Sequence, residues 1–163
     1  MALNGEGQAY EGWIKLPNAK RQKGGIALST AASAIKPLVD EKGLLEQIGA
    51  NTHELQQAIF CNLFNVLADK YAENWGELKN AFMFAAGFLG AIEFLQVKLI
   101  PYCNTKQDFS KELMSRVINL DSTNLILQEE VKGLGGKDAP KKVFTRLVSA
   151  FTPEESNIGN FKV

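Results

Sequence analysis

The sequence has little of what catalytic and metal sites require. Its 163 residues include one histidine, His53, and two cysteines, Cys61 and Cys103, and neither cysteine belongs to a C-x-x-C motif. Two cysteines do not make the disulfide framework of a small secreted domain. His53 opens the run HELQQ, which lacks the second histidine of the zinc motif H-E-x-x-H. We therefore expect no metal site, no cofactor and no catalytic residue, and we predict a non-enzymatic protein of the cytoplasm.

A long apolar run is also missing. The most apolar stretch, AFMFAAGFLGAI at 81–92, lies between Lys79 and Glu93, which bracket thirteen uncharged residues. A membrane span needs about 20, so we interpret this stretch as part of a buried helix. The first residues lack the basic-then-apolar order of a signal peptide. The net charge is zero, so no overall field attracts nucleic acid or anionic lipid, and no membrane contact is expected.

Helical periodicity dominates the sequence from Ser29 onward. The clearest helix follows Asn51, where apolar residues recur at spacings of three and four. The next helix is predicted from Glu77 to Ile100, with Pro101 ending it, although EFLQVKLI near its end also alternates as a strand does. We predict an all-α fold, an irregular bundle of about six helices.

The two ends of the chain differ from its body in charge and composition. Residues 1–36 carry five Lys or Arg against two Glu, residues 130–163 carry six against four acids, and residues 37–129 carry seven against twelve. Glycines and Pro17 interrupt any periodicity near the N-terminus. We predict a flexible basic arm over 1–28, a helical bundle domain over 29–152 and a polar C-terminal tail over 153–163.

Basic residues near both ends are the candidate nucleic-acid contacts. Lysine, arginine and hydroxyl groups on one exposed face are what contacts to phosphate use. Few aromatic residues lie among these charges, so stacking on single-stranded bases is only weakly supported. The alternative is a solvated helix face and a disordered basic end. The predicted contacts are Lys20, Arg21 and Lys23 in the arm and Lys141, Lys142 and Arg146 on the last helix.

Small residues gather on one side of the apolar helix, opposite its bulky ridge. Each glycine within a helix costs about 1 kcal/mol relative to alanine, so we expect another backbone to approach closely and compensate. That backbone belongs either to a neighbouring helix of the same domain or, if the face is exposed, to a protein partner or a second copy. The candidate interface residues are Met83, Ala86, Gly87 and Gly90.

These features favour a non-enzymatic small helical subunit or adaptor of a larger nucleoprotein assembly. It would contact the nucleic-acid backbone through the basic arm and the last helix. The alternative is a protein–protein interaction or homo-oligomerisation module that makes no nucleic-acid contact. A protein partner or self-association is expected in both cases. Glu93, an acid inside an apolar helix, is expected to pair with a lysine or arginine at the helix edge.

Overall fold

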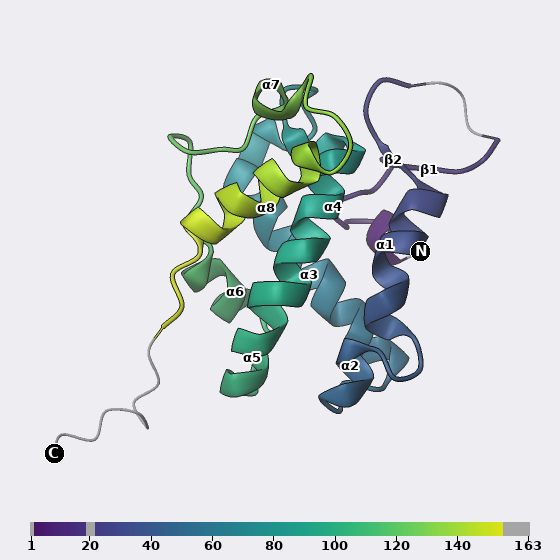
Figure 1. Cartoon of the computed structure of the whole chain (residues 1–163), viewed down its shortest axis with the longest axis vertical. Coiled ribbons are helices and arrows are strands. Elements are labelled where there is room, and N and C mark those ends of the chain that lie inside the picture. The colour runs from purple at the N-terminus through teal and green to yellow at the C-terminus, as the bar shows by residue number, and fades with distance from the viewer. Residues whose placement is uncertain (1, 19–21, 155–163) are drawn as a thin grey trace, which may run out of the picture.

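The computed structural model describes residues 2–18 and 22–154, which are mostly helical (Figure 1). Within them, the sheet consists of β1 (Ile14–Lys15) and β2 (Ile26–Ala27), paired in parallel. The α-helices are α1 (Leu28–Val39), α2 (Leu44–Gln47), α3 (His53–Tyr71), α4 (Ala85–Phe94), α5 (Ile100–Lys106), α6 (Lys111–Val117), α7 (Gln128–Val131) and α8 (Asp138–Ala150). The remaining elements are the 3₁₀ turns η1 (Ala2–Asn4), η2 (Ala72–Asn74) and η3 (Ala81–Met83) and the π-helical segment η4 (Leu95–Leu99). The predicted helical class is confirmed.

Parts of the predicted N-terminal arm pack into the core, whereas residues 16–18, 22 and 23 are exposed. Tyr10 and Ile26 are fully buried. The Tyr10 hydroxyl donates a hydrogen bond to the Phe82 carbonyl at 2.9 Å, and the Ala9 N–H donates to Asn65 Oδ1 at 2.9 Å. This differs from the prediction of a flexible arm. The apolar side chains scattered between the glycines are enough to bury the segment, because the glycines let the chain turn back onto the helices.

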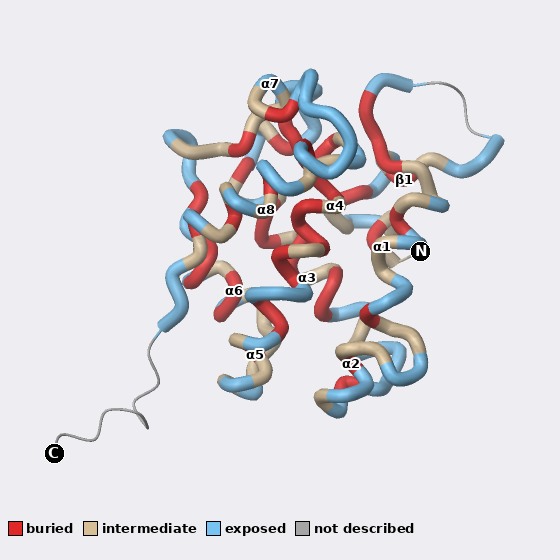
Figure 2. Tube along the Cα trace, in the orientation of Figure 1, coloured by how far each residue is buried: buried red, intermediate tan, exposed pale blue. Residues whose placement is uncertain are grey.

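Aromatic rings join this N-terminal segment to α3 and α4. Phe64 and Phe88 stack with their ring centroids 5.1 Å apart, and Tyr10 meets Phe64 edge-on at 5.0 Å. Such contacts contribute about 0.5–1.5 kcal/mol each beyond the area they bury. Buried residues accordingly concentrate in the interior between α3, α4 and α8 (Figure 2).

The apolar helix continues through Pro101 instead of ending there. Helices α4, η4 and α5 form one continuous helix, Ala85–Lys106. In the π-helical segment the Ile100 N–H donates to the Leu95 carbonyl, five residues back. A wider turn of this kind makes room for the proline ring and tolerates the absence of the proline N–H. The predicted helix end at Pro101 is therefore wrong, and EFLQVKLI forms no strand.

This 22-residue helix is long and apolar enough to cross a membrane, judged by length and composition alone; no other helix in the described part of the chain meets that test. Inside the protein, 56% of its most apolar window is buried. Much of its apolar surface is thus covered by the domain's own helices.

Helix α4 packs closely against α8 (Figure 1). A Cβ atom added at Gly90 would lie 2.6 Å from Val143 Cβ and 2.7 Å from the Pro140 carbonyl oxygen. Both distances are shorter than van der Waals contact allows, so glycine sets how closely the two helices approach. The backbone compensation expected for a glycine in this helix comes from α8.

Substituting Gly90 by alanine is predicted to destabilise the protein. The added methyl group forces α4 and α8 apart, and overpacking of this kind costs about 1–3 kcal/mol. Urea unfolding followed by circular dichroism measures the change. Gly135→Ala is the matched control, because a Cβ at Gly135 meets no atom within 4 Å. Equal stability of the two variants would contradict this description of the helix contact.

Candidate ligand-binding groove

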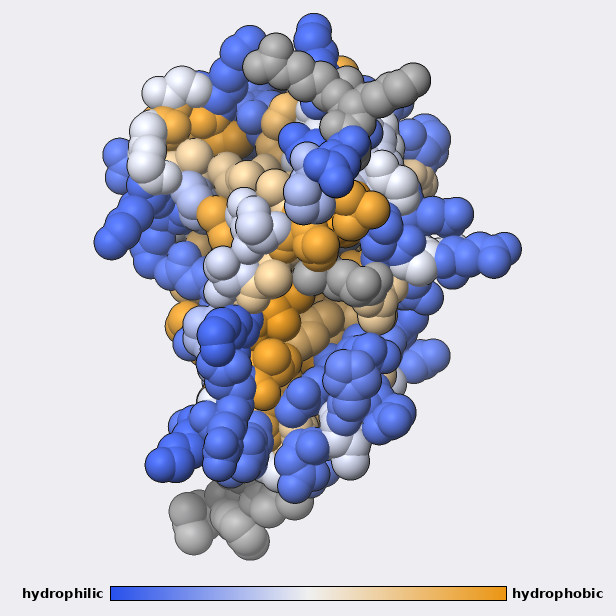
Figure 3. Space-filling model, turned by 90° about the vertical axis from the view of Figure 1, so that its right-hand side faces the viewer, coloured by the Kyte–Doolittle hydropathy of each residue, from blue (hydrophilic) through white to orange (hydrophobic). Residues whose placement is uncertain are grey.

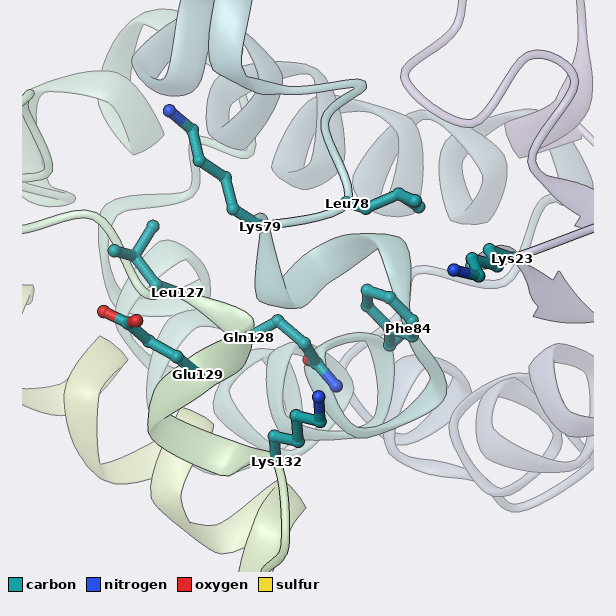
Figure 4. Close-up of a pocket in the computed structure, with 9 residues that line it drawn as sticks. Lys23, Leu78, Lys79, Phe84, Leu127, Gln128, Glu129 and Lys132 are labelled. Carbon is teal, nitrogen blue, oxygen red and sulfur yellow. The ribbon is translucent and has the colours of Figure 1, made fainter.

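A groove of about 690 Å³ opens between α7, η3 and the loop that precedes β2 (Figure 4). Its apolar lining comes from Gly24, Leu78, Phe84 and Leu127. Its polar lining comes from Lys23, Lys79, Gln128, Glu129 and Lys132. Ligand pockets in proteins measure about 300–1,000 Å³ and combine a mainly apolar lining with a few polar groups. The groove matches such pockets in both its volume and its mixed apolar and polar lining.

Two glycines hold one wall of the groove in place. Gly24 and Gly25 both have positive φ angles, 71° and 89°, and the Gly25 N–H donates to the Met83 carbonyl. A Cβ at Gly24 would lie 3.0 Å from Leu78 Cδ2 and 3.2 Å from the Met83 oxygen. Gly24 and Gly25 can approach η3 this closely only because glycine has no side chain. This passage brings Lys23 to the edge of the groove.

The opposite wall is a strap, residues 124–132, that pairs with residues 79–81. The Gln128 N–H donates to the Lys79 carbonyl at 2.7 Å, and the Ala81 N–H donates to the Ile126 carbonyl at 3.2 Å. Asn80 lies between them, fully buried. Its Nδ2 donates to the Trp75 carbonyl at 2.6 Å and its Oδ1 accepts from the Phe82 N–H at 2.8 Å. Both the nitrogen and the oxygen of the buried Asn80 amide are thus hydrogen-bonded.

Tyr71 fixes the strap to the end of α3. Its hydroxyl donates to the Ile126 carbonyl and accepts from the Ile126 N–H, both at 2.8 Å. Burial raises the pKa of Tyr71 far above its ordinary value. The hydroxyl therefore keeps its proton and can act as donor and acceptor at once.

Arg146, a predicted nucleic-acid contact, holds the other side of the strap. It forms an ion pair with Glu130, and its Nη2 donates to the Asn124 carbonyl at 2.8 Å. Only 25% of each charged side chain is exposed. Burial alone would raise the pKa of Glu130, but hydrogen bonds from Arg146 and from the Leu127 N–H, with the charges of Arg146 and Lys142, lower it. Arg146 thus has an internal partner that offsets its charge.

The other predicted nucleic-acid contacts lie in different settings. Lys23 lines the groove, and Lys142 is exposed on α8. Lys141 pairs with Glu93 at 3.4 Å and has its Nζ 4.4 Å from the centre of the Phe144 ring, so Glu93 has the basic partner expected for it. Lys20 and Arg21 lie outside the described residues.

Sequence reasoning missed Phe84, Gln128 and Lys132 as groove residues. Phe84 is more than 40 residues from Gln128 and Lys132 along the chain, and no periodicity connects it to them. The pairing of 79–81 with the strap brings them together, and that pairing has no local sequence signal.

The predicted interface face is covered within the domain. Met83, Gly87 and Gly90 are buried, and Ala86 is half-buried. A Cβ at Gly87 would lie 2.1 Å from the Ala81 carbonyl oxygen. Because these residues are small, η3 and α8 can approach α4 closely. Gly87 and Gly90 thus contact other elements of the same domain.

The cysteines and acids of the described residues form no reactive cluster. Burial, with a smaller effect of Asp108, raises the pKa of Cys103 to about 12, and burial also raises the pKa of Cys61. Both thiols are therefore protonated at neutral pH, and a thiol is a poor nucleophile. Within residues 2–18 and 22–154, no group of three His, Cys, Asp or Glu side chains could hold a metal ion.

A second, smaller groove of about 250 Å³ lies between η1, α1 and α3. Its apolar lining comes from Leu3, Ile35, Val39 and Phe60, and His53 and Cys61 also line it. Figure 3 shows apolar residues gathered in a strip along this side of the molecule, between hydrophilic side chains. His53 and Cys61 are eight residues apart on α3, which separates them by about 12 Å along the helix axis, too far for a hydrogen bond.

No known protein family, curated protein or solved structure matches the chain. A functional conclusion therefore depends on the two grooves and on the charges around them.

Replacing Arg146 with methionine is predicted to loosen the strap and lower the free energy of unfolding by about 1–3 kcal/mol at neutral pH. Because the pKa of Glu130 is lowered in the folded protein, this contribution is complete above 4.5, the ordinary pKa of a glutamate, and is lost as the pH falls through the lowered value. Urea unfolding at neutral and at acid pH measures both effects.

Arg116→Met is the control, because Arg116 forms an exposed ion pair with Glu154, and exposed pairs contribute little. If both variants lose the same stability, or if the loss in Arg146→Met does not depend on pH, the role given to Arg146 is incorrect.

Proposed function

We propose that this protein is a non-enzymatic helical subunit or adaptor that contacts nucleic-acid phosphates through one basic end. The proposal rests on a difference in ion pairing at that end: several exposed lysines have no acidic partner among the described residues, whereas three of the acids have a basic one. Lys23, Lys132 and Lys142 are exposed there, and none has an ion pair in the part of the chain that the structure describes. Three acids of the same region, Glu77, Glu93 and Glu130, are each paired with a base.

The pairing matters because it changes the local field while the net charge of the chain stays at zero. An ion pair contributes little to the potential a few ångströms away, so the groups without an ion pair determine its sign. Among the described residues of this end these are four lysines, Lys23, Lys132, Lys137 and Lys142, against two acids, Glu129 and Asp138. Glu129 also lines the groove, but its carboxylate points away from Lys23 and Phe84 (Figure 4). Lysines in such a setting match the spaced charges of a phosphate backbone.

The part of the proposal that concerns assembly follows from size and chemistry. A small helical domain that positions a backbone-binding surface acts on nucleic acid by holding it, and a protein partner would supply any chemistry. We place this activity in the cytoplasm, where two protonated thiols are stable without disulfide formation.

Reversing two exposed charges on and before α8 is predicted to weaken nucleic-acid binding. The double variant Lys137→Glu, Lys142→Glu should bind a fluorescent oligonucleotide about tenfold or more weakly at low salt, and its salt dependence should be shallower by about one to two phosphate contacts. Fluorescence anisotropy over a series of salt concentrations measures both quantities.

The control is Lys36→Glu, Lys42→Glu, which makes the same change in net charge in the last turn of α1 and in the loop between α1 and α2, at the opposite end from α7 (Figure 1). Equal binding by both double variants, or wild-type protein that binds no oligonucleotide at low salt, counts against the proposed function.

The apolar groove between α1 and α3 favours a second candidate function, a protein–protein interaction or self-association module. Ile35 and Val39 are only half-buried there, and an exposed apolar strip is typical of protein interfaces. This candidate predicts that the mass measured by analytical ultracentrifugation increases with concentration and that Val39→Glu abolishes the increase. A monomer at all concentrations would exclude self-association.

A further inference from the structure

We infer that the groove beside the strap binds one nucleotide of a single-stranded nucleic acid, with its base against Phe84 and its phosphates at Lys23 and Lys132. This inference rests on the proposed function and adds the class of nucleic acid and the residues that select it.

Phe84 supplies a flat apolar surface at the centre of the groove. It is the N-cap residue of α4 and has an extended backbone, with φ −131° and ψ 160°. Its side chain therefore leaves the helix end instead of joining the buried ridge, and it remains half-buried. In Figure 4 its ring lies between Lys23 on one side and Gln128 and Lys132 on the other. A ring exposed in this way can stack on any base, because every base has a π face.

Lys23 and Lys132 carry the positive charge on either side of that ring. Neither has an ion pair among the described residues, whereas Lys79, the third lysine of the groove, pairs with Glu77 at 3.1 Å. The Gly24–Gly25 passage fixes the position of the first lysine, and the strap fixes that of the second. Two cations that flank an aromatic ring match the two phosphates that flank a base.

Gln128 gives the groove a polar group suited to a base edge. Its backbone N–H is bonded to Lys79, which fixes the residue, but its side-chain Oε1 is shielded from solvent without a donor among the described residues. A buried acceptor without a donor costs about 1–3 kcal/mol. For a base to bond to this oxygen, the carboxamide must rotate to turn it into the groove, where the amino or imino group of the base would donate to it. Glutamine side chains recognise base edges in this manner.

These features favour an unpaired nucleotide over the two alternatives. In a duplex the bases are stacked on one another, so their faces cannot reach Phe84. The side chains of a glutamate-rich peptide would satisfy the lysines, but they offer no flat ring for Phe84 and cannot donate to Gln128 Oε1.

Phe84→Leu is the most direct variant, and Phe109→Leu is its matched control, since Phe109 is also half-buried but lies in the loop between α5 and α6. The probe is a fluorescent single strand of about eight nucleotides, compared with the duplex of the same sequence. We expect Phe84→Leu to weaken single-strand binding at least about fivefold, while duplex binding and the Phe109→Leu protein remain unchanged. Ultraviolet crosslinking of the single strand to wild-type protein should label the peptide that contains Phe84.

Gln128→Ala is the second variant, should Phe84→Leu prove unstable by circular dichroism, and it should also weaken single-strand binding alone. Unchanged single-strand affinity in a folded Phe84→Leu or Gln128→Ala protein overturns the inference. The proposed function survives that result if the α8 charge reversals still reduce binding. Tighter binding of a glutamate-rich peptide than of the single strand, dependent on Phe84, also overturns the inference. If the wild-type protein binds neither strand form, both proposals fail.

Discussion

The close contact between α4 and α8 is the constraint on which the rest of the structure depends. At Gly90 there is no room for even one methyl group between the two helices, and at Gly87 there is none between α4 and the backbone of η3. Helix α4 is therefore covered on one side by α8 and at its beginning by η3, while its bulky side chains fill the core toward α3. The positions of η3 and α8 in turn determine the two walls between which the groove opens, because Phe84 follows η3 directly and the strap leads into α8.

Polar contacts then fix the strap, which apolar packing alone does not hold in place. The strap has few backbone bonds of its own. The side chains of Tyr71 and Arg146 bond to it directly, and Asn80 fixes the 79–81 segment with which the strap pairs. All of them are wholly or largely shielded from solvent, where an unsatisfied partner would be costly. Their effect is to hold Gln128 and Lys132 at fixed places on a segment that contains only four helical residues. A binding surface on such an irregular segment needs this support, since loops position side chains less well than helices do.

The sequence was enough to predict the helical class and the apolar face of α3, because both follow from local periodicity. It was also enough to predict that a glycine in the central helix accommodates a second backbone. It misled at Pro101, since a π-helical segment before the proline removes the clash that normally ends a helix, and nothing local marks that segment. For the described part of residues 1–28, glycines and basic residues suggested a free arm, although Tyr10 and Ile26 are buried. The role of Arg146 depends on Glu130 and Asn124, and the groove depends on pairing between residues more than 40 positions apart. Such long-range pairing follows from the whole fold and cannot be read from any one segment.

The central claim is that the basic end of the molecule, and not the apolar side along α1, is the surface that contacts nucleic acid. Amide chemical shifts of the isotope-labelled protein, recorded by NMR while a single-stranded oligonucleotide is added, test it most directly. The account predicts shift changes confined to residues 22–25, to residues 78–84 and to the strap and the start of α8. Changes centred on Ile35, Val39 and Phe60, or no changes at saturating oligonucleotide, would contradict it.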